Sequence, residues 1–389
     1  MSEQRIAIVS PEMHRRGGTE RGNAEVMARL ARTHQICLFA HHWEPDGTPN
    51  ICFHHVPVLK WPGLLRFLSF YLSATRAVRR AERSHGRYAA VYSPGANCAE
   101  VEISTAWFCQ ARQLDLFRSG KHRPAPASAV DWLKLWHRWT YAWCVAQVEK
   151  AFYRLPNLRR VVTQSNLLAR DLHNFYGIPA ERVAVAHGGV NCETFTPEMR
   201  TALRTRARAE LGIAPGEFVF FFIGNNWLIK GLYHVIRALP HVPDARVMVV
   251  GLGAERPESW QAFSRQMGVA ERITYLHKRP DIIYYYAAAD ALLAPSVYDT
   301  FPLMPMEAMA CGLPVIISRN TGVAEIVGPA DCLVIENVED AAEMANAMRR
   351  MSSDEALRQQ LQANGLALAR KHRWDRIYQA VADEIGKAA

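Results

Sequence analysis

The 389-residue sequence lacks the cysteine and histidine patterns of a metal-binding or disulfide-stapled protein. Its eight cysteines are scattered, with no C-x-x-C pair, and no paired histidines stand at the spacing of metal ligands. We therefore expect reduced, mostly buried thiols, as in a cytosolic protein. We expect no metal site.

Long apolar runs are also missing. No uninterrupted apolar run approaches the roughly 18–20 residues that span a bilayer. The short apolar stretch at the start gives way to His14, Arg15 and Arg16, so the apolar core of a secretory signal is absent. A composition of 49% hydrophobic and 21% charged residues excludes a disordered, collagen-like or fibrous chain. We expect a cytoplasmic protein that contacts the inner face of the cytoplasmic membrane peripherally, if at all.

Acidic residues are scarce in one half of the chain only. The whole sequence has 46 Lys and Arg against 37 Asp and Glu, a net charge of +9. Residues 1–195 carry 25 basic and 15 acidic residues, whereas residues 196–389 carry 21 and 22. This asymmetry predicts two domains with different partners, the first attracted to an anion such as a phosphorylated substrate, acidic lipid or nucleic acid.

Short β-branched and apolar runs alternate with helical patterns along the chain. We expect strands at 5–10, 36–40, 89–93, 161–165, 182–186, 218–224, 246–250, 273–276, 291–294, 315–318 and 333–335. Because parallel strands need crossover connections, the pattern predicts two Rossmann-like α/β domains, each a doubly wound parallel sheet. We place them at 1–195 and 196–369. Two final helices lie within 354–387, and residues 370–389 are expected to pack back on the first domain.

The first domain contains aromatic and basic stretches. One covers residues 60–80, and the other places tryptophans at roughly helical spacing, at Trp132, Trp136, Trp139 and Trp143. Two interpretations stay open: the rings lie in a membrane interface with the cations facing lipid phosphates, or they fill the core.

The most informative segment covers residues 295–315. A strand is predicted to end at its start, a loop carrying Asp299 follows, and a helix then begins at a proline. Backbone amides at that helix start, on Leu303 and Met304, would form an anion site aimed at a phosphate. Glu307, one turn further in, can accept hydrogen bonds from sugar hydroxyls. Asp299 and Glu307 would then bracket a sugar nucleotide.

The segment resembles the E-x7-E signature of retaining glycosyltransferases of family 4, enzymes with the two-domain GT-B fold. The resemblance extends over nearly the whole chain and includes Gly17-Gly18, Thr163-Gln-Ser-Asn166, Gly189-Val190, Gly224 with Lys230-Gly231, Gly251-Leu-Gly253 and Gly322-Val-Ala-Glu325. Within the family, residues 17–21 and 230–231 are most similar to the bacterial lipopolysaccharide core glucosyltransferase that acts on heptose.

The resemblance implies a role for each matching residue. Three of them would be catalytic: Glu307 would hold the ribose, Asp299 the hydroxyls of the transferred sugar, and Lys230 would neutralise the donor diphosphate. The remaining donor-binding residues would be Gly17, Gly18, Gly224, Arg279, Phe301, Leu303 and Met304. The sequence departs from the family where Asp299 replaces a usual Glu, Pro302 replaces a frequent Gly, and no arginine accompanies Lys230.

Acceptor contacts are expected of Arg16, Glu20, Arg21, Glu102 and Thr105. The family's reaction retains the anomeric configuration by attack on the front face. No D-x-D triplet occurs in the chain, so we expect a metal-independent enzyme. It would need no cofactor beyond its co-substrate, a nucleotide-diphosphate sugar, with a UDP-sugar favoured.

The sequence thus predicts a hexosyltransferase acting on an anionic glycan or glycolipid, in the synthesis of lipopolysaccharide or another surface polysaccharide. Within related enzymes, the alternatives are a transferase for a small soluble acceptor and a sugar-nucleotide epimerase on the same fold. A basic nucleic-acid-binding protein would explain the charge, but it would leave Asp299 and Glu307 unexplained. We expect no nucleic-acid partner.

Overall fold

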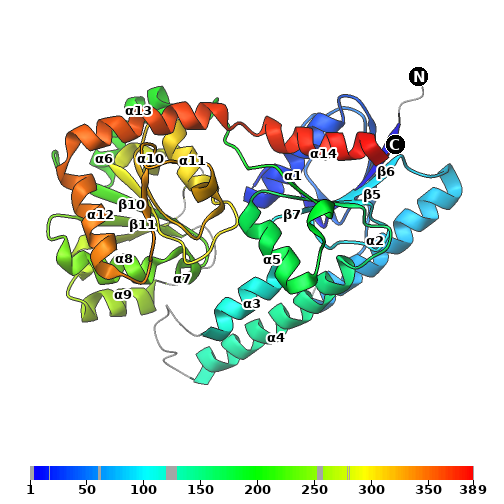
Figure 1. Ribbon diagram of the computed structural model, residues 1–389, viewed down its shortest axis with the longest axis horizontal. Helices are drawn as coiled ribbons and strands as arrows, with labels where there is room; N and C mark the ends of the chain where they lie inside the picture. The colour runs from blue at the N-terminus through cyan, green and yellow to red at the C-terminus, as the bar shows by residue number, and fades with distance from the viewer. Residues whose placement is uncertain are drawn as a thin grey trace. The chain divides into compact units, whose positions relative to one another are not determined.

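The computed structural model describes residues 4–16, 18–59, 63–119, 129–251, 257–277, 279 and 281–388. These residues form two compact units. The first contains residues 4–119, 129–186 and 375–388 where described, and the second contains residues 187–374. Figure 1 shows a parallel sheet with helices packed around it in each unit. The predicted fold class, two Rossmann-like α/β domains, is confirmed.

The first unit is built on a sheet in the order β5-β3-β1-β6-β7-β8-β9, in which all neighbours run parallel. Its strands are β1 (Arg5–Val9), β3 (Gln35–Ala40), β5 (Ile51–His55), β6 (Ala90–Ser93), β7 (Ile103–Ala106), β8 (Arg160–Thr163) and β9 (Val183–Val185). A separate short ladder joins β2 (Glu12–Met13) to β4 (His42–Trp43). The helices are α1 (Gly18–Leu30), α2 (Gly63–His85), α3 (Gln110–Ser119), α4 (Ala129–Phe152), α5 (Asn166–Tyr176), the 3₁₀ turn η1 (Ala180–Arg182) and α14 (Asp375–Ala388).

The second unit has a parallel sheet in the order β12-β11-β10-β13-β14-β15. Its strands are β10 (Val219–Gly224), β11 (Arg246–Gly251), β12 (Ile273–Leu276), β13 (Ala291–Ala294), β14 (Val315–Ser318) and β15 (Leu333–Ile335). The α-helices are α6 (Pro197–Glu210), α7 (Trp227–Lys230), α8 (Leu232–Ala238), α9 (Glu258–Gln266), α10 (Ile283–Ala288), α11 (Leu303–Ala310), α12 (Ala341–Ser353) and α13 (Glu355–Lys371). Three short 3₁₀ turns complete the described part of the second unit, namely η2 (Leu239–His241), η3 (Ala270–Arg272) and η4 (Gly322–Glu325).

Burial on both faces explains why the second sheet is so apolar. Successive side chains of a strand point to opposite faces. Phe221 therefore joins one apolar cluster, with α10 and α11, while Phe220 and Phe222 join another, with α8 and α12. All six residues of β10 are buried, as expected for a strand covered by helices on both faces.

The strand order places a ligand crevice in each unit. In doubly wound sheets, ligands bind beyond the carboxyl ends of the strands where the order reverses. In the first unit this switch point lies between β1 and β6, and in the second between β10 and β13.

The chain divides between the units at Ala186 and His187, earlier than the residue 195 inferred from the sequence. The reason is that Val190 bridges to Arg373 and Gly189 packs against the backbone of that same residue, which ties this stretch to the second unit. The chain returns to the first unit at Asp375, where α14 begins and contacts α1.

Candidate functional site

Glycines bring Lys230 to the switch point of the second sheet. β10 ends at Gly224, and the short helix α7 ends at Lys230. A Cβ atom on Gly224 would lie 3.0 Å from Lys230 Cγ, so the glycine leaves room for the lysine stem. Gly231 has a φ of +89°, and a Cβ there would lie 2.0 Å from the carbonyl oxygen of Pro295. Lys230 is therefore seated against the end of the neighbouring strand β13.

Lys230 and Asp299 form an ion pair across this switch point, Nζ to Oδ2. Their side chains are 20% and 14% exposed, so solvent and salt screen the pair only partly. The loop that carries Asp299 is fixed by its backbone: the Asp299 N–H donates to Asn320 O (3.1 Å), and Gly322 N–H donates to Asp299 O (2.9 Å). The structure thus joins two of the predicted catalytic residues, one after β10 and one after β13.

The amino end of α11 lies just beyond this loop. The helix begins at Leu303, followed by Met304, after the capping residue Pro302. The first N–H groups of any α-helix have no partner within the helix, and they carry its positive dipole end. Phe301 is buried immediately before the helix, with its ring centre 6.4 Å from that of His187. The predicted donor-binding amides of Leu303 and Met304 therefore follow Asp299 directly.

The Glu307 carboxylate accepts a hydrogen bond from a tyrosine that was not predicted from the sequence. Tyr286, on α10, is fully buried, and its hydroxyl donates to Glu307 Oε2 at 2.9 Å. Burial and the neighbouring Glu307 raise the pKa of Tyr286 well above its usual value, so the phenol keeps its proton and remains a donor. The run Tyr284-Tyr285-Tyr286 was the available signal, but only the fold shows which ring faces Glu307.

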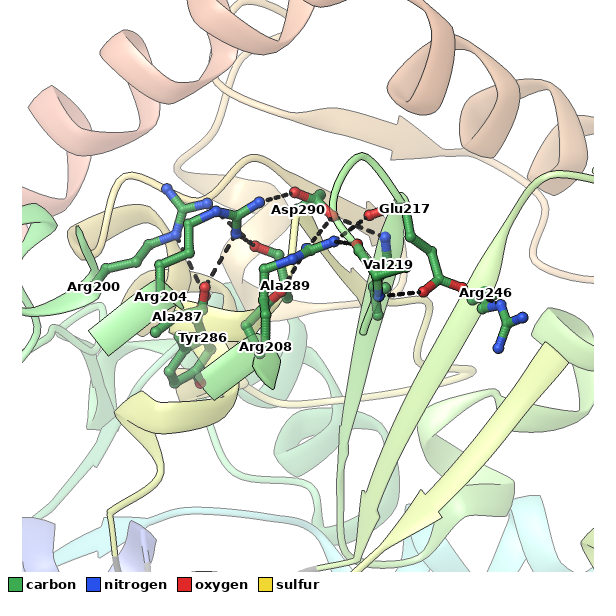
Figure 2. A network of polar contacts seen from close by, with 12 residues as sticks. Arg200, Arg204, Arg208, Glu217, Val219, Arg246, Tyr286, Ala287, Ala289 and Asp290 are labelled. Atoms are coloured by element: carbon green, nitrogen blue, oxygen red, sulfur yellow. Dashed lines mark hydrogen bonds and ion pairs between the residues drawn. The ribbon is translucent and has the colours of Figure 1, made fainter. Parts of the chain in front are cut away.

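Arginines of α6 fix the helix that carries Tyr286, as Figure 2 shows. Arg200 Nε donates to Tyr286 O (3.3 Å) and its Nη1 donates to Gly312 O (3.2 Å), so one guanidinium joins the ends of α10 and α11. Arg204 donates to the carbonyl oxygens at the end of α10 and pairs with Asp290. These bonds satisfy helix carbonyls that would otherwise be unpaired. They account for Arg200 and Arg204 as structural residues.

Arg279 is placed in a local cluster after β12. Its guanidinium lies 3.9 Å from the centre of the Tyr284 ring, within 3.5 Å of Glu210 and within 3.3 Å of Asp281. The structure brings Lys230, Asp299 and Glu307 onto adjoining elements, whereas the described contacts of Arg279 are with α6 and α10.

The predicted acceptor residues of the first unit are spread over different surroundings. Gly17 lies outside the described residues, and Gly18 begins α1, which also carries Glu20 and Arg21 in its first turns. Arg16 is 74% exposed at its side chain and pairs with Glu44. Arg15, beside it, pairs with Glu25 and Asp46, so acidic side chains offset these two cations.

Glu102 and Thr105 are not brought together with that loop. Glu102 precedes β7, at the amino edge of the sheet, where it accepts the Val91 N–H (3.3 Å) and lies 3.7 Å from Arg159. This edge is opposite the switch-point crevice. Thr105 is fully buried within β7, and its Oγ1 shares a 2.7 Å hydrogen bond with the Tyr92 hydroxyl.

A cavity of about 450 Å³ lies at the switch point of the first sheet. It is lined by Ser10 and Pro11 after β1, by the loop 94–97 after β6, and by side chains of α1 and α4. Among the predicted acceptor residues, Glu20 lines it. This is where the strand order predicts a ligand in the first unit.

Tryptophans of α4 are partly exposed. Trp136 is 62% and Trp143 47% exposed, so these two do not fill the core. Trp139 is half-buried, with Arg118 over its ring at 5.7 Å, and the side chain of Trp132 lies outside the described residues. None of the helices, within the described residues, is long and apolar enough to cross a membrane. In the described part of the chain, no three His, Cys, Asp or Glu residues gather where they would hold a metal ion.

Comparison with known proteins identifies the class. Residues 16–194 match Glycosyltransferase Family 4, and residues 204–367 match Glycosyl transferases group 1. Together with the two parallel-sheet units, these matches show that the chain belongs to the GT-B glycosyltransferases of family 4 and group 1.

Particular relatives are distant. The chain is 36% identical over 169 residues to the D-inositol 3-phosphate glycosyltransferase of Mycobacterium sp. (strain KMS), a region that covers 42% of this chain and only 38% of that relative. Among solved structures it is similar to WaaG, a glycosyltransferase involved in lipopolysaccharide biosynthesis (TM-score 0.76, 19% identity, 98% of this chain and 99% of that one). It is also similar to Anabaena HepE in complex with UDP-glucose (TM-score 0.69, 17% identity, 99% and 100%). At these identities the structures show the fold.

Proposed function

We propose that the chain transfers a sugar from a nucleotide-diphosphate donor to a hydroxyl of a glycan or glycolipid, with retention of anomeric configuration. The observation that carries the proposal is the arrangement at the switch point of the second sheet. There Lys230 and Asp299 pair, α11 begins with its amide groups, and Glu307 follows one turn later. A cation and helix amides suit a diphosphate, and carboxylates suit the hydroxyls of two sugars.

Lys230 has the main catalytic task in this proposal. When the bond from the sugar C1 to the diphosphate breaks, negative charge grows on the leaving oxygen. A fixed cation stabilises that charge more strongly in the transition state than in the bound substrate. Asp299 orients the lysine before the donor binds, through the ion pair already present.

Asp299 and Glu307 would hold the transferred sugar and the ribose, respectively. The acceptor oxygen forms its bond to C1 on the face that the diphosphate leaves, and the acceptor proton passes to the departing phosphate oxygen. No carboxylate nucleophile is then needed on the opposite face of the sugar. Catalysis would rest on positioning and on electrostatic stabilisation.

A UDP-sugar is the proposed donor. The structure named for HepE with UDP-glucose supports this choice, because it has the same fold over nearly the full chain. Glu307 would accept the ribose hydroxyls, supported by the Tyr286 hydroxyl beneath it.

The proposed biological setting is the synthesis of lipopolysaccharide or another surface polysaccharide, at the membrane surface. The motif at residues 17–21 and the excess of basic residues in the first half support it. The exposed Trp136 and Trp143 of α4 supply rings of the kind that lie at lipid headgroups.

A donor screen followed by product analysis tests the proposal. UDP-, ADP- and GDP-sugars are compared by thermal shift, and the anomeric configuration of the product is read from its proton NMR coupling. Glu307→Gln should abolish transfer, while the matched control Glu258→Gln, exposed on α9, should not. If no nucleoside diphosphate or its sugar stabilises the protein, the proposal is wrong.

A further inference from the structure

The cavity of the first unit has an acidic and aromatic lining. Three carboxylates face it, from Glu12, Glu20 and Glu149. Aromatic rings make up much of the rest of the wall, from Phe67, Trp107, Phe108, Tyr141 and Tyr153. None of the described residues that line it is a lysine or an arginine.

One polar atom in this wall is buried without a partner. Asn23, on α1, is 5% exposed, and its Oδ1 has no hydrogen-bond partner among the described residues. A buried polar oxygen without a hydrogen bond destabilises the folded state. An amide oxygen left in this state beside a cavity is ready to accept a hydrogen bond from a ligand.

Glu149 is a second buried acceptor in the same wall. It is 6% exposed, and its Oε2 accepts the Gln110 N–H (3.0 Å) and the Tyr176 hydroxyl. Those contacts fix the carboxyl group on one side, and within the described residues no hydrogen bond engages Oε1, the oxygen that a ligand would meet. Burial raises the pKa of Glu149 to about 7.

The lining discriminates between classes of ligand. A phosphate group here would lie among carboxylates with no cation in the wall, and like charges brought together repel each other. The nearby cations do not change this, because Arg66 pairs with Glu12 (2.7 Å) and Arg16 pairs with Glu44. A sugar ring matches the wall: its hydroxyls donate to carboxyl and amide oxygens, and its C–H face packs on aromatic rings. A volume of about 450 Å³ lies within the range of small-molecule sites.

We propose that this cavity binds an uncharged, unphosphorylated sugar ring of the acceptor, with hydroxyls donating to Asn23 Oδ1 and Glu149. This inference rests on the proposed function, because the sugar is an acceptor only if the chain is a transferase. The sequence predicted an anionic glycan or glycolipid acceptor, whereas the ring that this cavity would hold is neutral. Any phosphate of a larger acceptor would lie outside the cavity.

Saturation-transfer NMR on the full chain tests the inference with defined probes. The neutral probes are the methyl glycosides of glucose, galactose, mannose, heptose and N-acetylglucosamine, together with myo-inositol. The charged probes are glucose 6-phosphate, inositol 3-phosphate and glucosamine. We expect at least one neutral probe to bind, and the phosphorylated counterparts to bind at least tenfold more weakly.

Variants locate the binding. Asn23→Leu should weaken binding of the neutral probe at least tenfold, and Glu149→Gln should weaken it at least threefold. Asn23 and Glu149 are buried, so their variants could fail to fold. Tyr141 lines the cavity but is partly exposed, and Tyr141→Ala should also weaken binding of the neutral probe. Its control is Trp143→Ala on the same helix, which does not line the cavity. Stronger binding of a phosphorylated or amino sugar, binding by none of the neutral probes, or no effect of all three cavity variants would overturn the inference.

UDP titrations on the same samples separate the two proposals. The cavity variants should leave UDP affinity within twofold, because none of the changed residues is a predicted donor residue and Lys230, Asp299 and Glu307 belong to the second unit. Neutral-sugar binding without binding of UDP, ADP or GDP would refute the transferase function and not the cavity. UDP binding without neutral-sugar binding would refute the cavity and not the donor site.

Discussion

Removing the Tyr286 hydroxyl tests whether the support of Glu307 matters for the donor. Tyr286→Phe keeps the buried ring and deletes one 2.9 Å hydrogen bond to the Glu307 carboxyl. A hydrogen bond to a charged group contributes about 1.5–3 kcal/mol. If that energy serves to orient Glu307 toward the ribose, the Kd for UDP rises by about 13- to 160-fold. If it stabilises only the fold, Tm falls by about 3–12 °C for a unit of this size and the Kd is unchanged.

Isothermal titration calorimetry with UDP distinguishes these two results when the titration temperature is well below the Tm of each variant. Glu307→Gln and the double variant complete a thermodynamic cycle with Tyr286→Phe. We expect the two single changes to be strongly non-additive, because both act through one contact. Additive losses, or a Kd for Tyr286→Phe within twofold of the wild type, would refute the reasoning.

Further predictions concern the lysine, its glycine, the arginine network and the buried carboxyl. Lys230→Met should lower kcat/KM about 100-fold or more in a transfer assay, since it removes the cation opposite the leaving group, while the exposed Arg265→Met should not. Gly224→Ala should displace the lysine stem and lower kcat/KM about 10- to 100-fold with little change in the circular dichroism spectrum. Arg204→Met should reduce the free energy of unfolding by about 1–3 kcal/mol in urea, because carbonyls at the end of α10 lose their donor. Glu149 has a folded pKa raised to about 7 from 4.5, so the folded state binds the extra proton and stability should fall as pH rises from about 4.5 to about 7. Glu149→Gln should flatten that part of the stability curve, and an unchanged slope would contradict the assignment.

Much of the fold was predictable because buried parallel strands are locally apolar. β10 and β13 were found near their observed positions for that reason. β5 and β7 were missed, and each has a physical cause. β5 (Ile51–His55) is an edge strand with partly or largely exposed side chains, and its apolar run of three residues is too short to stand out. β7 (Ile103–Ala106) is small and partly polar, and its burial comes entirely from its neighbours.

The candidate site was predictable only where a motif fixed the spacing. Asp299 and Glu307 stand in one short segment, and the strand-loop-helix pattern alone places them on adjoining elements. The Lys230–Asp299 pair follows from strand order. β10 and β13 are neighbours in the sheet, although 66 residues separate the end of β10 from the start of β13. Tyr286 and Asn23 could be identified only from the structure. The Tyr286 hydroxyl contacts Glu307, and the Asn23 side chain lines a cavity, and neither contact can be inferred from the sequence.

The central claim is that the switch point of the second sheet is a nucleotide-diphosphate site built on Lys230. Titration calorimetry of UDP into the wild-type chain and Lys230→Met tests it most directly. We expect saturable, salt-sensitive binding to the wild type and at least a tenfold weaker Kd for the variant, at unchanged Tm. Equal affinity in both proteins, or no binding of UDP, ADP or GDP by the wild type, would contradict it.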